Sequence, residues 1–126
     1  MFLSIERLPK YFYAKKTKFR KDETHISRIY NYTVIIFVFS GILRFTEDGK
    51  KIELHPGDYY IQREGLIQEG NEKCEEPEYF FVEFNGEFNE KSGIPIRGKF
   101  SEDSFKKLIN ELCEAENSVT ATFYKK

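Results

Sequence analysis

Tryptophan is absent from the 126-residue chain, and cysteine occurs only twice, as Cys74 and Cys113. Two cysteines without CxxC spacing are too few for a disulfide framework, so we predict a reduced, cytoplasmic protein. Neither cysteine has a histidine nearby in the sequence, which argues against a catalytic thiol. Cys113 falls on the apolar face of a predicted helix and is expected in the core.

Long hydrophobic runs are also missing. The longest run, 34–39, has six apolar residues, whereas a membrane-spanning helix needs about 20. The first ten residues include Glu6, Arg7 and Lys10, which does not fit a secretory signal. We therefore predict that the chain has no membrane partner.

An excess of charge of one sign is missing as well. The 20 basic and 21 acidic residues leave a net charge of −1, which excludes a general polyanion binder. The charges are nevertheless uneven, with a basic stretch at 7–28 and an acidic stretch at 64–90. The basic stretch is interpreted either as a solvated face or as an arm that lies near phosphates.

The chain is rich in aromatic residues, with 13 Phe and 8 Tyr, and its length suits one domain. Short β-rich segments alternate with turn signals, which predicts a sandwich or barrel. The strongest strand is 32–39, which is apolar on both faces and therefore expected at the centre of a sheet. Ser40-Gly41 is expected to end it, and a second strand is expected at 42–46.

The remaining predicted strands are separated by recognisable turns. Asp48-Gly49 supplies the positive φ angles of a type I′ hairpin turn, and Pro56-Gly57-Asp58 forms another turn. We interpret 71–78 as an acidic loop and 87–98 as a linker. The strands expected from these signals are 11–13, a stretch around His25, 51–54, 59–61, 66–68 and 79–84.

A helix is predicted from Ser101, which can cap it, to about residue 115. Phe100 and Phe105 occupy the positions of a hydrophobic staple. The apolar stripe of this helix comprises Phe105, Leu108, Ile109, Leu112 and Cys113. We divide the chain into a barrel at 1–98 and a helical segment at 99–126, where Ser118 is expected to cap a second helix. The end of the sequence is interpreted either as a cut from a longer protein or as an ordinary frayed terminus.

The order of turns and strands resembles the cupin barrel. Gly41, the Asp48-Gly49 turn, the Pro56-Gly57-Asp58 turn and Gly65 are followed by the aromatic strand 79–86. More narrowly, residues 20–86 resemble the N-terminal effector-binding and dimerisation domain of AraC-family transcription regulators. The resemblance implies a mainly β fold, a cupin-like (double-stranded β-helix) barrel with a C-terminal α-helix.

Metal cupins hold their ion with histidines and a glutamate at fixed positions. In this chain those positions fall, within a residue, on Arg28, Tyr30, Val34 and Gln68, none of which is a good ligand for a divalent ion. His55 is expected at the rim, and His25 lacks partners for a metal. We therefore predict no metal, no cofactor and no metal-dependent enzyme.

Other catalytic constellations are missing from the sequence, including a Gly-rich phosphate loop and a nucleophilic serine motif. We predict no catalytic residues. Two alternatives stay open. One is a small metal-free cupin enzyme, a sugar isomerase or epimerase, and the other is a carbohydrate-binding module.

Strand alternation and the cupin frame predict a polar and aromatic barrel mouth that binds a ligand. We expect the ligand to be a small polar effector, with sugars as a class that fits, since aromatic rings stack on their C–H faces and arginine pairs with their hydroxyls. Tyr79 and Phe81 could equally be plain core residues. The predicted ligand-binding residues are Arg28, Tyr30, Gln68, Tyr79 and Phe81.

The AraC resemblance further implies a homodimer, with the helix at 101–115 as part of its surface. It also implies that 15–21 belongs to an N-terminal arm or its neighbouring strand. Members of the family read DNA through two C-terminal helix-turn-helix units. Residues after Phe100 are too few for one, so DNA is expected as a partner only through a domain that this chain lacks.

Overall fold

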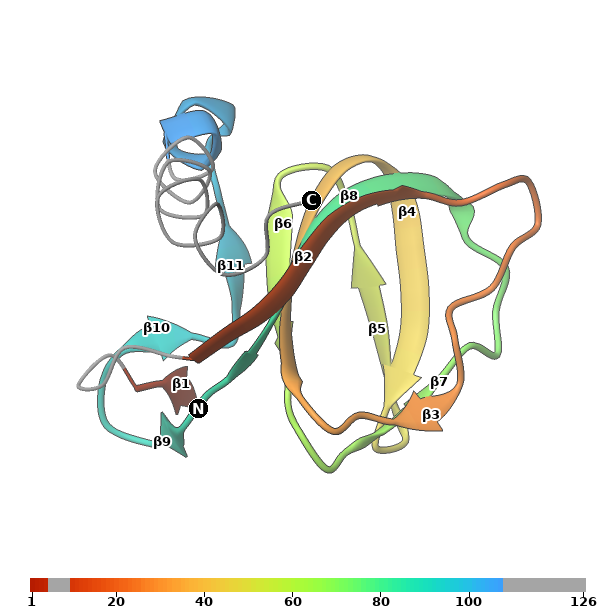
Figure 1. Ribbon diagram of the computed structural model, residues 1–126. Helices are drawn as coiled ribbons and strands as arrows, with labels where there is room; N and C mark the ends of the chain where they lie inside the picture. The colour runs from red at the N-terminus through yellow and green to blue at the C-terminus, as the bar shows by residue number, and fades with distance from the viewer. Residues whose placement is uncertain (5–9, 108–126) are drawn as a thin grey trace, which may run out of the picture.

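A computed structural model describes residues 1–4 and 10–107 (Figure 1). This part of the chain is mainly β, with antiparallel strands and one helix that starts at Glu102. The strands are β1 (Phe2–Leu3), β2 (Lys10–Lys18), β3 (Arg28–Ile29), β4 (Thr33–Glu47), β5 (Lys50–Leu54), β6 (Asp58–Gln62), β7 (Ile67–Glu69), β8 (Glu75–Asn85), β9 (Phe88–Asn89), β10 (Ile94–Pro95) and β11 (Arg97–Lys99).

Strand β4 is the centre of the fold. Its first half pairs with β6 on one side and β8 on the other, and its second half pairs with β5 and β7. The prediction of two strands broken at Ser40-Gly41 was therefore wrong, because β4 runs through this point. Gly41 has a φ of 72°, and the register against β8 shifts between Val38 and Ser40 and again between Ser40 and Ile42, so the strand bends at this point.

The sheets are open. The larger one holds eight strands, with β11, β6, β4, β7 and β3 in order and β2, β8 and β5 joined at its branches. The smaller sheet has the order β10-β1-β9. The strand pairs of the described residues do not close a ring, so the predicted barrel is present here only as a mainly β, curled antiparallel sheet.

The hairpin between β4 and β5 forms as predicted. Asp48 and Gly49 have φ angles of 49° and 84°, and a type I′ turn needs positive φ at both central residues. The turn at Pro56-Gly57-Asp58 also leads into a strand as expected, since β6 starts at Asp58.

Two segments predicted as irregular contain strands. The predicted acidic loop at 71–78 ends earlier, because β8 already starts at Glu75. The predicted linker at 87–98 contains β9, β10 and the start of β11. These strands have two or three residues each, which is too short for an alternating pattern to show in a sequence.

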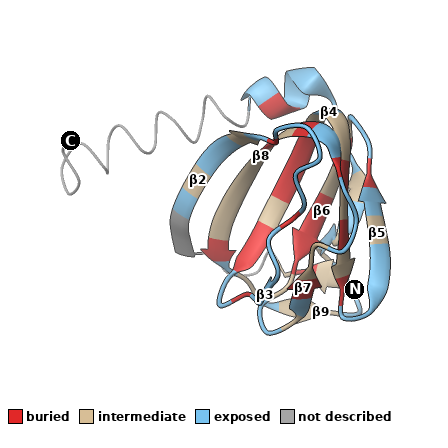
Figure 2. Ribbon diagram, turned by 90° about the vertical axis from the view of Figure 1, so that its right-hand side faces the viewer, coloured by how far each residue is buried: buried red, intermediate tan, exposed pale blue. Residues whose placement is uncertain are grey.

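The larger sheet is buried on both faces at its centre, in the first half of β4, as predicted for this strand, whereas β5 is mostly exposed (Figure 2). On its concave side β4 and β8 contribute Val34, Ile36 and Tyr79 to the main core. On the opposite side Ile35 and Val82 pack against Leu3 and Phe84 in a second cluster. The main core consists of Phe19, Tyr30, Val34, Ile36, Val38, Leu43, Phe45, Leu54, Tyr60, Cys74 and Tyr79.

The helix starts as predicted. The Ser104 amide donates a hydrogen bond of 3.1 Å to Oγ of Ser101, and the rings of Phe100 and Phe105 lie 5.6 Å apart. Phe105 is buried against the outer face of the sheet. The rest of the predicted stripe, Leu108, Ile109, Leu112 and Cys113, lies outside the described residues, as do most of the segment 99–126 and the position of the predicted second helix.

The uneven charges of the sequence meet in one strand pair. The basic strand β2 runs antiparallel to the acidic strand β8, and Lys16 forms an ion pair of 2.8 Å with Glu78. The basic residues at 15–18 therefore lie in β2, beside the acidic residues of β8. In the described residues, no helix is long and apolar enough to span a membrane.

Candidate functional site

A cavity of about 270 Å³ opens on the concave side of the larger sheet. Alternate residues of β8 reach it, since Tyr79, Phe81 and Glu83 share one face of that strand. Val34 and Ile36 form part of its wall from β4. Its other lining residues are Tyr13, His25, Ile26, Arg28, Tyr30 and Gln62.

Four of the five predicted ligand-binding residues line this one cavity, namely Arg28, Tyr30, Tyr79 and Phe81. That these four residues bind a ligand stays a prediction. The fifth, Gln68, is completely buried and lies behind the wall, where its Oε1 accepts a hydrogen bond from Gln62.

The prediction that Arg28 projects inward was wrong. The residue is exposed, and its guanidinium carbon lies 4.5 Å from the centre of the Tyr30 ring. Among the described residues no carboxylate forms an ion pair with it. Arg28 is therefore a cation at the mouth of the cavity, held over an aromatic face and free to donate hydrogen bonds to a ligand.

Aromatic rings line the interior. The Phe81 ring lies 5.9 Å from that of Tyr13 and 6.2 Å from that of Tyr79. Burial raises the pKa of the Tyr30 hydroxyl to about 12 and also raises the pKa of Tyr79, so both hydroxyls are protonated at neutral pH. Such a set offers flat faces for stacking and hydroxyls for hydrogen bonds.

His25 sits at the base of the cavity, 4% exposed. Its Nδ1 lies 2.7 Å from the carbonyl oxygen of Ile26, which can only accept, so Nδ1 carries the proton. Burial, with a smaller effect of the Arg28 charge, lowers the pKa of His25 to about 4. The imidazole is therefore neutral, and its Nε2 accepts from Gln62 Nε2 at 3.1 Å and from the Tyr30 hydroxyl at 3.4 Å.

A chain of buried polar groups continues behind this histidine. Gln62 Nε2 donates to Gln68 Oε1 at 3.2 Å, and Gln68 Nε2 donates to Glu47 Oε2 at 2.8 Å. The Tyr60 hydroxyl donates to the other oxygen of Glu47 at 2.7 Å, and Arg63 lies 3.7 Å from it. One acceptor in this series of hydrogen bonds has no donor, because Gln62 Oε1 is buried without a hydrogen-bond partner in the described structure.

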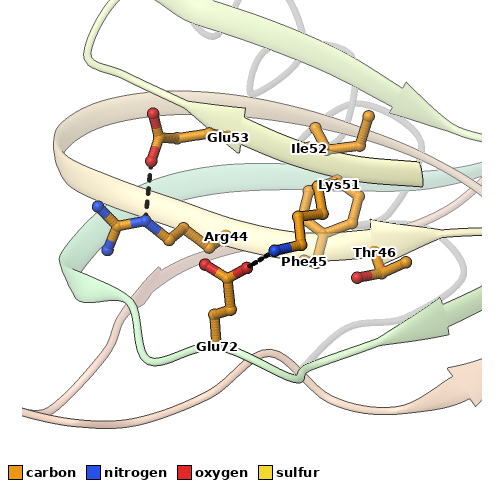
Figure 3. Close-up of a pocket in the computed structure, with 7 residues that line it drawn as sticks. All are labelled: Arg44, Phe45, Thr46, Lys51, Ile52, Glu53 and Glu72. Carbon is orange, nitrogen blue, oxygen red and sulfur yellow. Dashed lines mark hydrogen bonds and ion pairs between the residues drawn. The ribbon is translucent and has the colours of Figure 1, made fainter. Parts of the chain in front are cut away.

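A second hollow, of about 220 Å³, lies along the β4–β5 hairpin (Figure 3). Its charges pair with one another, since Arg44 lies 2.8 Å from Glu53 and Lys51 lies 3.0 Å from Glu72. The ion pairs satisfy the groups that would orient a ligand. The cavity behind Arg28 is the better candidate site, because among the described residues Arg28 has no ion-pair partner and the Gln62 Oε1 atom has no hydrogen-bond donor.

The described residues contain no cluster of three or more His, Cys, Asp or Glu side chains arranged to hold a metal. His55 is exposed at the end of β5, as expected for a rim residue, and its Nε2 lies 3.0 Å from Glu53. His25 is hydrogen-bonded within the core. The positions predicted to replace metal ligands are occupied by Arg28, Tyr30 and Val34 on the cavity wall and by Gln68 behind it.

Sequence reasoning missed Tyr13, Gln62 and Glu83 as cavity residues. Glu83 follows Tyr79 and Phe81 at a spacing of two, so strand alternation could have included it. Gln62 lies at the end of β6, a strand from which no cavity residue was predicted. Tyr13 carries no such signal, because β2 is brought to the cavity only by its pairing with β8.

No protein-family model matches the chain. The chain is similar to a protein of Bacillus subtilis (strain 168) described as the uncharacterized HTH-type transcriptional regulator YisR, with 27% identity over 97 residues. The match covers 74% of this chain and 34% of that protein, so the chain spans about a third of the length of this relative.

Proposed function

We propose that this chain is the ligand-sensing part of a transcription regulator of the AraC type and that its cavity binds a small polar effector without chemical turnover. The single observation that carries the proposal is the cavity itself, where aromatic rings, an arginine without an ion-pair partner among the described residues and one unpaired amide oxygen meet in one place. The similarity to a protein described as a helix-turn-helix regulator supports the regulatory role.

The curled sheet supports a cupin-type origin for this site. A long central strand bent at Gly41 curves the sheet around the main core, and the cavity opens within that curve. A cavity of about 270 Å³ lies just below the range of roughly 300–1,000 Å³ that drug-sized ligands occupy, so the effector is small. Sugars of one ring fit its lining, since they combine apolar C–H faces with hydroxyls.

DNA contact and dimerisation belong to the same proposal. A helix-turn-helix unit needs two helices, and the described residues hold only the helix that starts at Glu102. Under the proposal these residues therefore sense the effector, and another part of the regulator reads DNA. The segment that follows Phe100 contributes to pairing with a second copy.

Calorimetric titration with a panel of small polar compounds, monosaccharides included, tests the proposal on the unaltered protein and on Arg28→Ala. Arg28 is exposed, so its removal leaves the fold intact, and the loss of a charge-assisted hydrogen bond weakens binding by about tenfold or more. Arg20→Ala removes an exposed arginine that does not line the cavity and keeps the affinity unchanged.

The bound compound is recovered unaltered after long incubation, as followed by NMR of the compound. Conversion of any panel compound by the purified protein would contradict the sensing role. Equal affinity of Arg28→Ala and the unaltered protein would remove Arg28 from the site.

A further inference from the structure

The orientation of the Gln62 amide is fixed by the buried chain behind it. The Glu47 carboxylate accepts hydrogen bonds, so Gln68 must turn its amide nitrogen toward Glu47 and its Oε1 toward Gln62. Gln62 in turn must present its nitrogen to Gln68. Each amide in the series is therefore aligned by the acceptor that precedes it.

The histidine at the base of the cavity fixes the same orientation from the other side. Because Nδ1 of His25 donates to the Ile26 carbonyl, Nε2 is an acceptor and faces the Gln62 nitrogen at 3.1 Å. Rotating the Gln62 amide by half a turn would bring its oxygen against two acceptors, Gln68 Oε1 and His25 Nε2. Both contacts would change from attractive to repulsive, so the oxygen cannot exchange places with the nitrogen.

This alignment leaves an acceptor without a donor in a buried wall. Gln62 is completely buried and lines the cavity, and its Oε1 has no partner among the described groups. Buried amide oxygens in folded proteins are nearly always hydrogen-bonded, so this atom calls for a donor from outside the chain. The cationic group of the site, Arg28, lies at the mouth and not at the base.

We propose that Gln62 Oε1 is the specificity-determining acceptor of the cavity, so that the ligand enters with a neutral hydroxyl or N–H donor directed at Gln62 and with any acceptor or anionic end toward Arg28. This inference rests on the proposed function, because it assigns the polarity of the ligand in the same site. An anionic or acceptor-only group cannot occupy the base, where it would meet the oxygen of Gln62.

Matched pairs of compounds that differ only in the donor test this inference by calorimetry on the unaltered chain. In the hydroxyl arm, each monosaccharide or cyclic polyol is compared with its deoxy analogues. In the N–H arm, each small amide is compared with the ester of the same shape. In the third arm, small carboxylates without a hydroxyl or N–H group are titrated.

We expect one donor-bearing compound to bind and its donor-free partner to bind about tenfold or more weakly. In Gln62→Met, a change that removes the amide at similar volume, the two partners should differ by about twofold or less. Thr46→Val removes a hydroxyl from the hollow of Figure 3 and keeps the full difference. The arm that supplies the binding compound tells a hydroxyl from an N–H donor.

A spectroscopic readout covers the case in which Gln62→Met does not fold. The chain has two glutamines, Gln62 and Gln68, so selective ¹⁵N labelling of glutamine side chains gives two NH₂ signals. The donor-bearing compound should shift the Gln62 signal, and its donor-free partner should leave it in place.

Three results overturn the inference. Carboxylates or donor-free partners that bind as tightly as donor-bearing compounds would reject the role of Gln62 and leave the effector-binding proposal standing. A donor preference that persists in a folded Gln62→Met variant would do the same. If no compound of any arm binds, both the inference and the proposed function fail.

Discussion

His25 is a buried base whose protonation opposes folding. The pKa of the folded state is about 4, against 6.5 for an ordinary histidine, chiefly because burial disfavours the imidazolium. Between these values the unfolded chain binds a proton that the folded chain does not. Stability is therefore complete above pH 6.5 and falls as the pH falls toward 4.

Urea unfolding at pH 7 and pH 5 measures this effect. The 1.5 pH units between 6.5 and 5 correspond to a loss of about 2 kcal/mol from His25. His25→Phe keeps a ring stacked on Phe45 and removes the titration, so its stability changes less over this interval. His55→Ala, at the exposed end of β5, keeps the loss. A stability of the unaltered protein that is equal at both pH values would contradict the assignment.

Strand alternation explains which cavity residues could be predicted from the sequence. Tyr79 and Phe81 were placed correctly on one face, because a strand places every second side chain on the same side. The polar chain through Gln62, Gln68 and Glu47 could not be predicted, since it joins three strands whose mutual register no local pattern reveals. Arg28 was expected inside from strand alternation and the cupin frame. It is exposed because β3 is a two-residue strand at the edge of the sheet, which the sequence does not reveal.

At the scale of elements, Gly41 shapes the site by bending β4. A side chain at this position faces two obstacles, because φ is 72° and a Cβ would collide with the backbone carbonyl oxygens of Glu75 and Glu76. Carbonyls of the neighbouring strand cannot move without breaking the β4–β8 pairing. The bend therefore requires glycine, both for conformation and for space.

Gly41→Ala is expected to lower the free energy of unfolding by about 3 kcal/mol or more, from backbone strain and overpacking together. Gly65→Ala is the matched control, since Gly65 has a φ of 84° but no atom within 4 Å of an added Cβ. It loses only about 1 to 2 kcal/mol from the left-handed conformation. Urea denaturation compares the two, and equal losses would show that the close contact with β8 does not constrain the fold.

Elements with a strong local signal were predicted, and those made by pairing alone were not. The β4–β5 hairpin was predicted because Asp48-Gly49 fixes its turn chemistry, and the helix start because Ser101 and Phe105 fix a cap and a staple. The smaller sheet β10-β1-β9 was missed, since its strands of two residues exist only through their partners. For the same reason the expected closure of the barrel could not be judged from the sequence.

In the whole molecule, the cavity and the helix lie on opposite faces of the same strands. Val34 and Ile36 of β4 line the cavity, whereas Phe37 and Phe39 of the same strand face the helix. In β8, Phe80 faces the helix between the cavity residues Tyr79 and Phe81. The surface on which the helix packs is therefore separated from the cavity by one layer of strands.

Phe105 is the side chain through which the described part of the helix is attached to the sheet. Its ring lies 4.6 Å from that of Phe39, 5.0 Å from that of Phe37 and 5.6 Å from that of Phe80. Phe105→Ala removes a buried ring from this cluster and is expected to lower the free energy of unfolding by about 3 kcal/mol. Lys106→Ala, on the exposed side of the same helix, changes it by less than about 0.5 kcal/mol. Both values are measured by urea denaturation, and a loss below about 1 kcal/mol in Phe105→Ala would show that the helix does not pack on the sheet in solution. The cavity is on the opposite face of the sheet. A Phe105→Ala protein whose helix no longer packs on the sheet but which still binds its ligand would show that ligand binding does not depend on the attachment of the helix.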